Sequence, residues 1–457
     1  MKLTGAKILV NELIAQGADK IFGYPGGSVL DIYDEIYLNS DKIEHYISAH
    51  EQGAAHAADG YARVSGKTGV VIATSGPGAT NLTTGIATAY LDSVPMVAIT
   101  GNVATKLIGR DSFQEVNIVG ITMPITKHNY LVYSASELRK TVQEAFHIAN
   151  DGRPGPVLID IPKDIQRETA DYDELVTETI SPRDKTIAFN LENACALLKN
   201  AKKPYIYAGG GVIISNASDE LVAFAERINA PIATSLMGIT AIPDEHQLSL
   251  GMAGMHGRYA ASISLSECDL LIAIGVRFSD RATGNKEKFI NGCKLLQIDI
   301  DRAEINKNIK ADEYIVGDIK SVISSLLEKI PQTKNDAWLN RIAALKKCSE
   351  NALWEGYQKF APKQIVECVQ EILGDTPVAT DVGQHQMWAA QYYRFKQPRS
   401  FVTSGGLGTM GYGMGSAIGA SIASGGRRVV LFTSDGSFHM NMNELTTAVS
   451  YKLPITI

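Results

Sequence analysis

The amino-acid sequence predicts an α/β protein built from three domains, each with a parallel sheet. Three blocks of the chain alternate short runs of β-branched and aliphatic residues with Ala-rich helical stretches, and Gly and Pro punctuate the alternation. This pattern is typical of strands joined by crossover helices. The length of 457 residues agrees with the number of blocks, because a domain commonly takes about 150 residues.

The first block covers residues 1–170 and opens with an amphipathic helix at residues 7–14. Apolar runs bounded by Gly, Pro or charged residues predict its strands. We expect them at residues 20–23, 69–74, 96–100 and 157–161. The following segment, 171–190, is charged, lacks helical periodicity and contains Pro182, so we expect a linker there.

The second block covers residues 190–330. Its apolar runs predict strands at residues 204–208, 270–275 and 295–301. A long polar helix with little strand potential, at about residues 337–359, is expected to join it to the third block.

The third block covers residues 360–457. It contains apolar runs at 377–381 and 401–403 and a third run that leads into Asp435. After Asp435 the pattern predicts a helix at 443–451 and a strand that has only begun at 454–457. Because an α/β domain commonly needs about 100–150 residues, we expect this third domain to be incomplete.

The composition narrows the class of protein. A net charge of −6 is spread along the chain, so no basic face for nucleic acid and no polybasic membrane patch is expected. The five cysteines are odd in number and lack Cys-x-x-Cys spacing, which favours reduced, mostly structural thiols. No signal segment opens the chain and no apolar run approaches the roughly 20 residues of a membrane span. We therefore expect a cytoplasmic protein.

The most informative motif is Asp435-Gly436-Ser437, which directly follows an apolar run of strand length. An acidic residue at the carboxyl end of a buried parallel strand lies where open α/β sheets bind their ligands. A carboxylate there suits Mg²⁺, which one or two protein oxygens hold together with phosphate oxygens. Asp435 is therefore a candidate metal ligand.

Glu51 is a candidate acid–base residue. By itself, a Glu in the first turn of a helix is most often a residue that the helix dipole favours. The residues that follow it up to Ala58 are nearly all small, however, which suits a helix packed closely against a flat group. With the Asp435 motif in the same chain, we favour a catalytic role for Glu51.

Three Gly-rich turns follow predicted strands, at residues 23–27, 74–78 and 209–211. The second presents backbone N–H groups to an anion or is simply a tight turn, and the two readings are evenly matched. It is not a P-loop, since the Lys-Ser/Thr pair is absent. The third is a weak dinucleotide-binding signal, because the G-x-G-x-x-G spacing is not met.

Asp299 ends a predicted strand in the second block, where it either accepts from an adenosine ribose or simply caps the strand. The segment Arg277-Phe278-Ser279-Asp280-Arg281, taken alone, favours a solvated turn over an anion or flavin contact. The nine histidines show no His-x-His or His-Glu-x-x-His spacing, so no zinc site is expected. A Gly-x-Ser-x-Gly elbow is absent as well.

Taken together, these motifs resemble the acetohydroxyacid synthase (acetolactate synthase) catalytic subunit, a thiamine-diphosphate enzyme, from the first residues to the last. The matching segments are 23–27, 50–52, 74–78, 113–115, 153–156, 161–164, 254–257, 277–281, 383–388 and 403–411. Ser434 departs from the family pattern, which usually has Gly before the Asp-Gly pair. The family also has an Asn metal ligand further along, and the chain ends at Ile457, so the resemblance implies a truncated third domain.

The resemblance implies a role for most of these residues. Glu51 would activate the pyrimidine of thiamine diphosphate across a dimer interface, with Gln114 and Lys163 at the active-site entrance beside Phe113. Asp435 would hold Mg²⁺, and Met410 would lie under the cofactor and bend it. The other residues expected at thiamine diphosphate are Gly27, Gln384, His385, Gly408, Gly436 and Ser437. The residues expected at FAD, which is structural in this family, are Arg153, Gly209, Gly210, His256, Arg277, Asp299 and Asp318.

The implied function is acetolactate synthesis. The enzyme would decarboxylate pyruvate and transfer the two-carbon unit to a second pyruvate or to 2-ketobutyrate, the first common step of branched-chain amino acid biosynthesis. A homodimer or tetramer and a small regulatory subunit are the implied partners. Two alternatives stay open: a pyruvate oxidase-like enzyme, and a catalytically silent fragment that binds FAD or partner subunits because the C-terminal metal ligand is missing.

Overall fold

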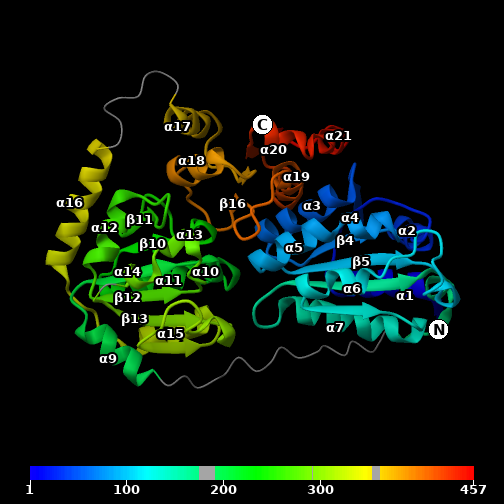
Figure 1. Ribbon diagram of the computed structural model, residues 1–457, viewed down its shortest axis with the longest axis horizontal. Helices are drawn as coiled ribbons and strands as arrows, with labels where there is room; N and C mark the ends of the chain where they lie inside the picture. The colour runs from blue at the N-terminus through cyan, green and yellow to red at the C-terminus, as the bar shows by residue number, and fades with distance from the viewer. Residues whose placement is uncertain (174–190, 291, 353–360) are drawn as a thin grey trace. The chain divides into compact units, whose positions relative to one another are not determined.

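The computed structural model of the chain describes residues 1–173, 191–290, 292–352 and 361–457. It divides into two compact units (Figure 1). The first unit comprises Met1–Arg183, Pro377–Gly383 and Val402–Ile457, and the second comprises Asp184–Thr376 and Gln384–Phe401. The domain boundaries inferred above, 1–170, 190–330 and 360–457, stay a prediction.

A six-stranded sheet with strand order β3-β2-β4-β5-β7-β6 forms the centre of the first block. Its neighbouring strands pair in parallel. The strands are β2 (Lys20–Gly23), β3 (Glu44–Ile47), β4 (Gly69–Ala73), β5 (Met96–Asn102), β6 (His128–Leu131) and β7 (Pro156–Pro162). A short antiparallel pair, β1 (Lys2–Thr4) with β8 (Thr169–Asp171), ties the start of the block to its end.

Helices cover both faces of this sheet, with α3 and α5 on one face and α1 and α7 on the other (Figure 1). The helices of the block are α1 (Gly5–Ala15), α2 (Leu30–Leu38), α3 (Glu51–Ser65), α4 (Pro77–Asn81), α5 (Thr83–Asp92), α6 (Ile118–Thr122), α7 (Leu138–Asn150) and α8 (Lys163–Arg167). Short 3-10 turns are η1 (Thr105–Leu107), η2 (Met123–Ile125) and η3 (Ala135–Glu137).

The central strand β4 shows why its sequence is apolar throughout. Consecutive side chains of a strand point to opposite faces. Val70 and Ile72 accordingly join the core under α1 and α7, while Val71 and Ala73 join the core under α3. A parallel strand covered on both faces has no solvent side, so its residues read as one continuous apolar run.

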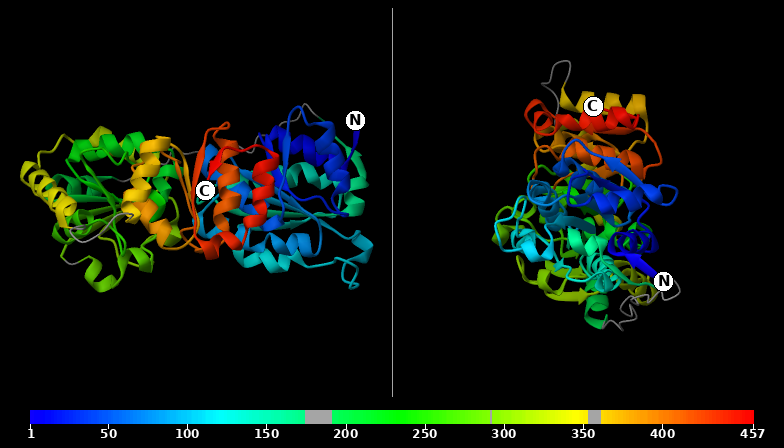
Figure 2. Two further views of the ribbon diagram at one scale, coloured as in Figure 1. Left: turned by 90° about the horizontal axis from the view of Figure 1, so that it is seen from above. Right: turned by 90° about the vertical axis from the view of Figure 1, so that its right-hand side faces the viewer.

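The third block adds a four-stranded sheet with order β16-β15-β17-β18. Its strands are β15 (Val378–Thr380), β16 (Phe401–Val402), β17 (Val429–Phe432) and β18 (Ile455–Thr456). Strand β17 pairs in parallel with β15 on one side and with β18 on the other. Its helices in the first unit are α19 (Tyr412–Ala423), α20 (Asp435–His439), η6 (Met442–Glu444) and α21 (Leu445–Ser450). In the right-hand view of Figure 2, orange α19 lies between the red C-terminal helices and the blue helices of the first block.

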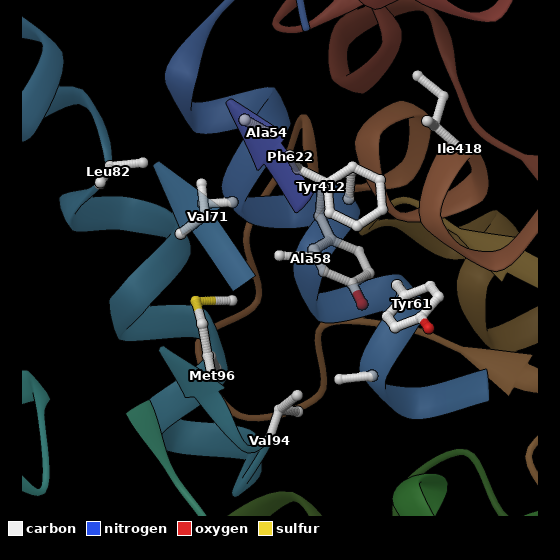
Figure 3. Close-up of a cluster of buried hydrophobic side chains, with 14 of the residues drawn as sticks. Phe22, Ala54, Ala58, Tyr61, Val71, Leu82, Val94, Met96, Tyr412 and Ile418 are labelled. Atoms are coloured by element: carbon white, nitrogen blue, oxygen red, sulfur yellow. The ribbon is translucent and has the colours of Figure 1, made fainter. Parts of the chain in front are cut away.

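The helices α3 and α19 pack against each other at unusually short range. Small residues make this possible, because a Cβ on Gly419 would lie 1.9 Å from the carbonyl oxygen of Ala57, and one on Gly60 would lie 2.2 Å from that of Ser416. Figure 3 shows Tyr412 and Ile418 of α19 beside residues of α3 in one buried cluster. This shared core joins the first and third blocks within one unit.

The second unit contains a six-stranded parallel sheet with order β11-β10-β9-β12-β13-β14. Its strands are β9 (Pro204–Ala208), β10 (Ile232–Thr234), β11 (Ser249–Met252), β12 (Leu270–Ile274), β13 (Lys294–Asp299) and β14 (Glu313–Val316). The helices are α9 (Glu192–Asn200), α10 (Gly210–Ile214), α11 (Ser218–Ile228), α12 (Tyr259–Glu267), α13 (Asp280–Thr283), α14 (Lys286–Phe289), α15 (Ile319–Lys329), α16 (Asp336–Ala352), α17 (Pro362–Leu373) and α18 (Gln384–Tyr392), with η4 (Leu236–Gly238) and η5 (Arg302–Glu304).

The predicted strands of all three blocks are present within two residues of their expected bounds. The predicted linker falls mostly outside the described residues, as does the end of the helix expected at 337–359. The strands that were not predicted are β1, β3, β6, β8, β10, β11 and β14. Of these, β3, β6, β11 and β14 are edges of the six-stranded sheets, and β10 is a three-residue interior strand. Among the described residues, no helix is long and apolar enough to cross a membrane.

Candidate active site

Each of the three sheets has a point where the strand order reverses. The chain leaves β2 for β3 on one side and returns to β4 on the other, so the first reversal lies between β2 and β4. The same reasoning places the second between β9 and β12 and the third between β15 and β17. Ligands of open α/β sheets bind at the carboxyl ends of strands at such points, and the predicted motifs follow these strands.

At the first reversal, the turns that follow β2 and β4 are locked together. A Cβ on Gly26 would lie 2.5 Å from the side chain of Thr74, so only Gly fits there. The Ser28 hydroxyl lies 2.9 Å from the Thr74 hydroxyl and accepts a hydrogen bond from the Ser75 amide at 2.8 Å. Ser28 was not singled out in the sequence, because a lone Ser after a Gly-rich turn carries no distinctive signal.

Glu51 is the first residue of α3, and the His50 side chain caps this helix by accepting from the Gln52 amide. The Glu51 carboxylate accepts a hydrogen bond from Asn81 Nδ2 at 3.0 Å. A Cβ on Gly78 would lie 3.1 Å from Glu51 Oε1, so the second Gly-rich turn passes directly beside this carboxylate. The structure thus brings Glu51 to the 74–78 turn. Asn81, three residues beyond this turn, was not predicted as a site residue from the sequence.

A second carboxylate holds the start of α3. Glu444, in η6 of the third block, is buried and accepts from the amides of His50 at 2.9 Å and Ala49 at 3.2 Å. Burial raises its pKa above the usual range, although these hydrogen bonds oppose the rise. Glu444 fixes the backbone that presents Glu51, and its place in a helical stretch offered no sequence signal for that role.

A cavity of about 680 Å³ lies at the carboxyl ends of β5 and β7 in the first block. Four predicted residues line it together: Gly27, Phe113, Gln114 and Lys163. The Lys163 ammonium donates to the carbonyl oxygen of Gly27 at 2.7 Å. The Phe113 ring is 88% exposed, which is unusual for an aromatic side chain at a cavity mouth.

Backbone conformation next to the cavity is strained. Gln114 has a φ of 60° and Gly76 a φ of 59°. The two residues touch, since a Cβ on Gly76 would lie 2.9 Å from Gln114 Cα. A positive φ at a bulky residue costs energy and tends to occur where a side chain must be aimed at a ligand.

A buried carboxylate lies behind the cavity wall. Asp160 of β7 accepts from Thr100 Oγ1 at 2.8 Å and from Asn102 Nδ2 at 2.6 Å, and Asn102 itself lines the cavity. Burial raises the pKa of Asp160 to about 7, against the lowering effect of those two hydrogen bonds. The carboxyl therefore changes its charge near neutral pH beside the cavity.

The third reversal carries the Asp435 motif. Asp435 begins α20 with its side chain exposed, directly after β17. A Cβ on Gly436 would lie 3.6 Å from Met410 Cε, so the structure brings the tip of Met410 to this motif. Gly408 has a φ of 70° in the same exposed loop. The Ser437 hydroxyl is buried instead, and it donates to the carbonyl oxygen of Val382.

At the second reversal, glycine permits close backbone packing. A Cβ on Gly209 would lie 2.0 Å from the carbonyl oxygen of Gly275, which follows the neighbouring strand β12. Gly210 is the first residue of α10. Packing therefore accounts for Gly209 by itself, while the turn, with Gly209 buried and Gly210 partly buried, lies at the position where such sheets bind nucleotides.

The two acidic residues predicted to bind FAD, Asp299 and Asp318, already accept hydrogen bonds within the second unit. Asp318 caps α15, accepting from the Ser321 amide at 3.0 Å and, with its other oxygen, from the Ser215 hydroxyl at 2.6 Å. Asp299 ends β13 and accepts from the Asp301 amide at 2.9 Å. The sequence allowed two roles for Asp299, binding a ribose or capping the strand, and this hydrogen bond is a strand-capping contact.

The remaining predicted residues are distributed between the units. Arg153 lies in the first unit and donates to the Ser93 hydroxyl at 2.8 Å. In the second unit, His256 is exposed after β11, and its carbonyl oxygen accepts from Gln391. Gln384 and His385 open α18 in that unit. Arg277 follows β12, next to Phe278, which is buried, so the segment 277–281 is not entirely the solvated turn expected from its sequence.

The donors at the third reversal fit a magnesium-bound diphosphate. Asp435 offers a hard carboxylate oxygen, as Mg²⁺ prefers. Gly436 leaves room for a bulky anion, because Met410 Cε is the nearest atom that a Cβ would meet. A group of three or more His, Cys, Asp or Glu side chains suited to a metal is not found among the described residues.

Three protein-family models, all of one class of enzyme, match successive segments of the chain. The model for the thiamine pyrophosphate enzyme N-terminal TPP binding domain matches residues 3–121, the central-domain model matches 191–326 and the C-terminal TPP binding domain model matches 381–457. The predicted fold of three parallel-sheet domains of this enzyme type is thereby confirmed.

Curated relatives cover the full chain. It is 47% identical to a probable acetolactate synthase large subunit of Methanocaldococcus jannaschii, and the match spans all of this chain and 79% of the relative. It is 46% identical to the acetolactate synthase large subunit of Corynebacterium glutamicum, of which the match covers 74%. It is 43% identical to the acetolactate synthase isozyme 3 large subunit of Escherichia coli, of which the match covers 81%. The chain belongs to the acetolactate synthase large-subunit family of thiamine pyrophosphate enzymes.

Proposed function

We propose that this chain performs the acetolactate synthase reaction at a site built from the first and third sheet reversals. The reaction decarboxylates pyruvate and joins the two-carbon unit to a second pyruvate or to 2-ketobutyrate, the first common step of branched-chain amino acid biosynthesis. One observation carries the proposal: the first reversal presents Glu51 on a helix start that Glu444 fixes, and the third reversal presents Asp435 beside Met410. In the proposed dimer, the first reversal of one chain meets the third reversal of the other.

Thiamine diphosphate is the cofactor of this proposal, with Mg²⁺ held by Asp435. When bound, thiamine diphosphate supplies the carbon nucleophile and the electron sink for decarboxylation. Glu51 donates and withdraws a proton at N1′ of the aminopyrimidine, and Asn81 orients its carboxylate by the hydrogen bond at 3.0 Å. The Met410 side chain, which lies beside Gly436, would support the bound cofactor. Gln384, His385, Gly408 and Ser437 complete the proposed binding residues.

The cavity next to the first reversal serves as the entrance for the ketoacids. Lys163 supplies a cation for their carboxylate, and Gln114 is fixed in a strained conformation that aims it at the same space. The exposed Phe113 side chain lines the same cavity, where closing over a bound ketoacid would exclude water from it.

FAD is part of the proposal as a structural cofactor of the second unit. The Gly209–Gly210 turn at the second sheet reversal supplies its anchor. The other residues proposed for FAD are Arg153, His256, Arg277, Asp299 and Asp318. The side-chain oxygens of Asp318 already cap α15 and hold Ser215, so this residue is the weakest member of the set.

The proposed partners follow from the family. The relatives are named large subunits, which implies a small subunit, and we propose a regulatory small subunit for this chain as well. A homodimer or tetramer that shares its active sites between chains and a cytoplasmic location complete the proposal. The names of the relatives favour acetolactate synthase over a pyruvate oxidase-like enzyme and over a catalytically silent protein.

The substitution Glu51→Gln tests the proposed proton transfer. Because Gln has the same shape but cannot exchange a proton, kcat should fall by about 10²–10⁴-fold. FAD binding and the unfolding transition should remain those of the unchanged protein. Glu44→Gln is the matched control, since Glu44 is on neighbouring β3 and its half-exposed carboxylate pairs with Lys20. Near-normal turnover of Glu51→Gln would end the role proposed for Glu51.

A further inference from the structure

The loop 403–411 joins β16 to α19 and carries Gly408 and Met410 on its exposed middle part. Its far end is tied to the third block itself. Asp381, at the end of β15, accepts from the Gly411 amide at 2.7 Å, and Asn441 donates to the Gly411 carbonyl oxygen at 3.1 Å. The position of the loop's other end depends on the first block.

Asp92 of α5 holds the beginning of the loop. Its two carboxylate oxygens accept from two consecutive backbone amides, Gly406 at 2.7 Å and Gly405 at 3.0 Å. Hydrogen bonds to an ionised acceptor are about twice as strong as neutral ones. A side chain at residue 406 is also excluded, since a Cβ there would lie 2.7 Å from Asp92 Oδ1. The carboxylate and the glycine pair are therefore fitted to each other.

The place of Asp92 is unfavourable for the helix that carries it. Asp92 is the last residue of α5, where the helix dipole disfavours an anion. Arg63 compensates by donating to Asp92 at 2.9 Å and to Asp59 at 2.6 Å. Burial lowers the pKa of the Arg63 guanidinium. The interactions with Asp59, Tyr412 and Asp92 raise it by more than burial lowers it, so this pKa lies well above the usual value.

A third contact supports the loop from the same helix. Thr88, one turn before Asp92, lies with its hydroxyl 2.8 Å from that of Thr409. The Thr88 hydroxyl donates to the Thr84 carbonyl oxygen, so Thr409 is the donor in this pair. Thr409 directly precedes Met410. Helix α5 thus contacts the loop at two places: Asp92 binds Gly405 and Gly406 before Gly408, and Thr88 contacts Thr409 just before Met410.

We propose that Asp92 is a positioning residue that orders loop 403–411 and thereby sets the affinity for thiamine diphosphate. This inference rests on the proposed function, which places the cofactor beside Met410. Asp92 does not touch the reacting atoms; it acts by fixing the backbone of Gly405 and Gly406. Without both amide contacts, the loop samples conformations in which Met410 and Gly408 leave the binding position, and binding then has to order them.

The test compares Asp92→Asn with the unchanged chain. Asn retains one acceptor and turns an NH₂ group toward the second amide, so one amide bond is lost, the other is no longer charge-assisted, and Arg63 keeps only the carboxylate of Asp59 from this pair. Hydrogen exchange of a peptide covering 403–411 should quicken about 10-fold or more. The dissociation constant of thiamine diphosphate, titrated calorimetrically with Mg²⁺, should rise by a similar factor. Exchange in β4 and β5 should stay unchanged.

Two further variants complete the test. Gly406→Ala disturbs the same contact from the loop side and should show the same faster exchange, so the test survives if Asp92→Asn fails to fold. Asp19→Asn is the matched control, because Asp19 is a half-exposed carboxylate that pairs with Lys67 and accepts from Tyr61 of α3. It should change neither the loop exchange nor the cofactor affinity.

The outcomes separate this inference from the proposed function. Unchanged loop exchange in Asp92→Asn overturns the positioning role, whatever the cofactor does. Faster loop exchange with an unchanged dissociation constant also overturns it, because the loop order then does not set the affinity. If the unchanged chain binds no thiamine diphosphate, the proposed cofactor site is wrong, and the proposed effect of Asp92 on affinity is wrong with it.

Discussion

The close contact of α3 with α19 makes a sharp prediction for Gly419→Ala. The new methyl group would lie 1.9 Å from the Ala57 carbonyl oxygen, which belongs to the backbone and cannot rotate away. Ordinary C···O contacts begin near about 3.3 Å, so the two helices must separate by about 1.4 Å or bend. We expect this substitution to loosen the core shared by the first and third blocks.

Two opposing effects decide the magnitude. Replacing Gly by Ala inside a helix favours the helix by about 1 kcal/mol. Overpacking a well-filled core costs about 1–3 kcal/mol and occasionally more, and an overlap with backbone falls at the upper end of that range. The net destabilisation should therefore be about 2 kcal/mol, which corresponds to roughly 30-fold faster exchange of amides that open with this core.

Hydrogen exchange measured by mass spectrometry is the suitable assay, because it reports on α3 and α19 directly. Tryptophan fluorescence does not serve, since Trp338 and Trp388, the tryptophans among the described residues, belong to the second unit. Ser421→Ala is the control, because it also introduces Ala into α19. The Ser421 hydroxyl is buried with no hydrogen-bond partner in the described part of the chain, so its removal should be neutral or stabilising. Equal or slower exchange in Gly419→Ala would refute the packing argument.

Three further predictions concern metal, pH and thiols. Asp435→Asn should raise the Mg²⁺ concentration needed for half-maximal binding of thiamine diphosphate by about 10-fold or more; calorimetric titration checks this, and an unchanged requirement excludes Asp435 as a ligand. The raised pKa of Asp160, about 7, means that the folded state keeps a proton that the unfolded state has lost above about pH 4. The unfolding free energy should therefore fall by about 1.4 kcal/mol per pH unit between those values, and Asp160→Asn should remove this slope in urea titrations; an identical slope in the variant contradicts it. Exposed Cys348 and Cys368 should react with a thiol reagent well before buried Cys195 and Cys268, as peptide mapping will show.

The longer strands inside the sheets were predictable because they are buried on both faces, whereas interior β10 was missed because its apolar run has only three residues. β4 and β5 have no solvent side, so their sequences are unbroken apolar runs that any reading of the chain recognises. The edge strands β3 and β14 escaped prediction because one side of each faces no further strand, and their sequences Glu-His-Tyr-Ile and Glu-Tyr-Ile-Val resemble loops or helix ends.

The candidate site shows the same division. Asp435 and Glu51 were found because each is the first residue of a helix: Asp435 follows strand β17 closely, and Glu51 follows the helix cap His50. Such positions can be recognised from the order of residues along the chain. Glu444 and Asp92 were missed because their partners are amides distant in sequence: His50 lies 394 residues before Glu444, and Gly406 lies 314 residues after Asp92. Such contacts exist only after the helices pack, and local sequence patterns do not encode them.

The central claim is that this chain forms acetolactate at a site containing Glu51 and Asp435. The most direct measurement is product analysis after purified protein is incubated with pyruvate, Mg²⁺, thiamine diphosphate and FAD, with 2-ketobutyrate added in a parallel reaction. We predict acetolactate alone in the first reaction and additional 2-aceto-2-hydroxybutyrate in the second, both dependent on thiamine diphosphate. Acetaldehyde or acetyl phosphate in place of acetolactate, or no product from a folded chain that binds thiamine diphosphate, would contradict the account.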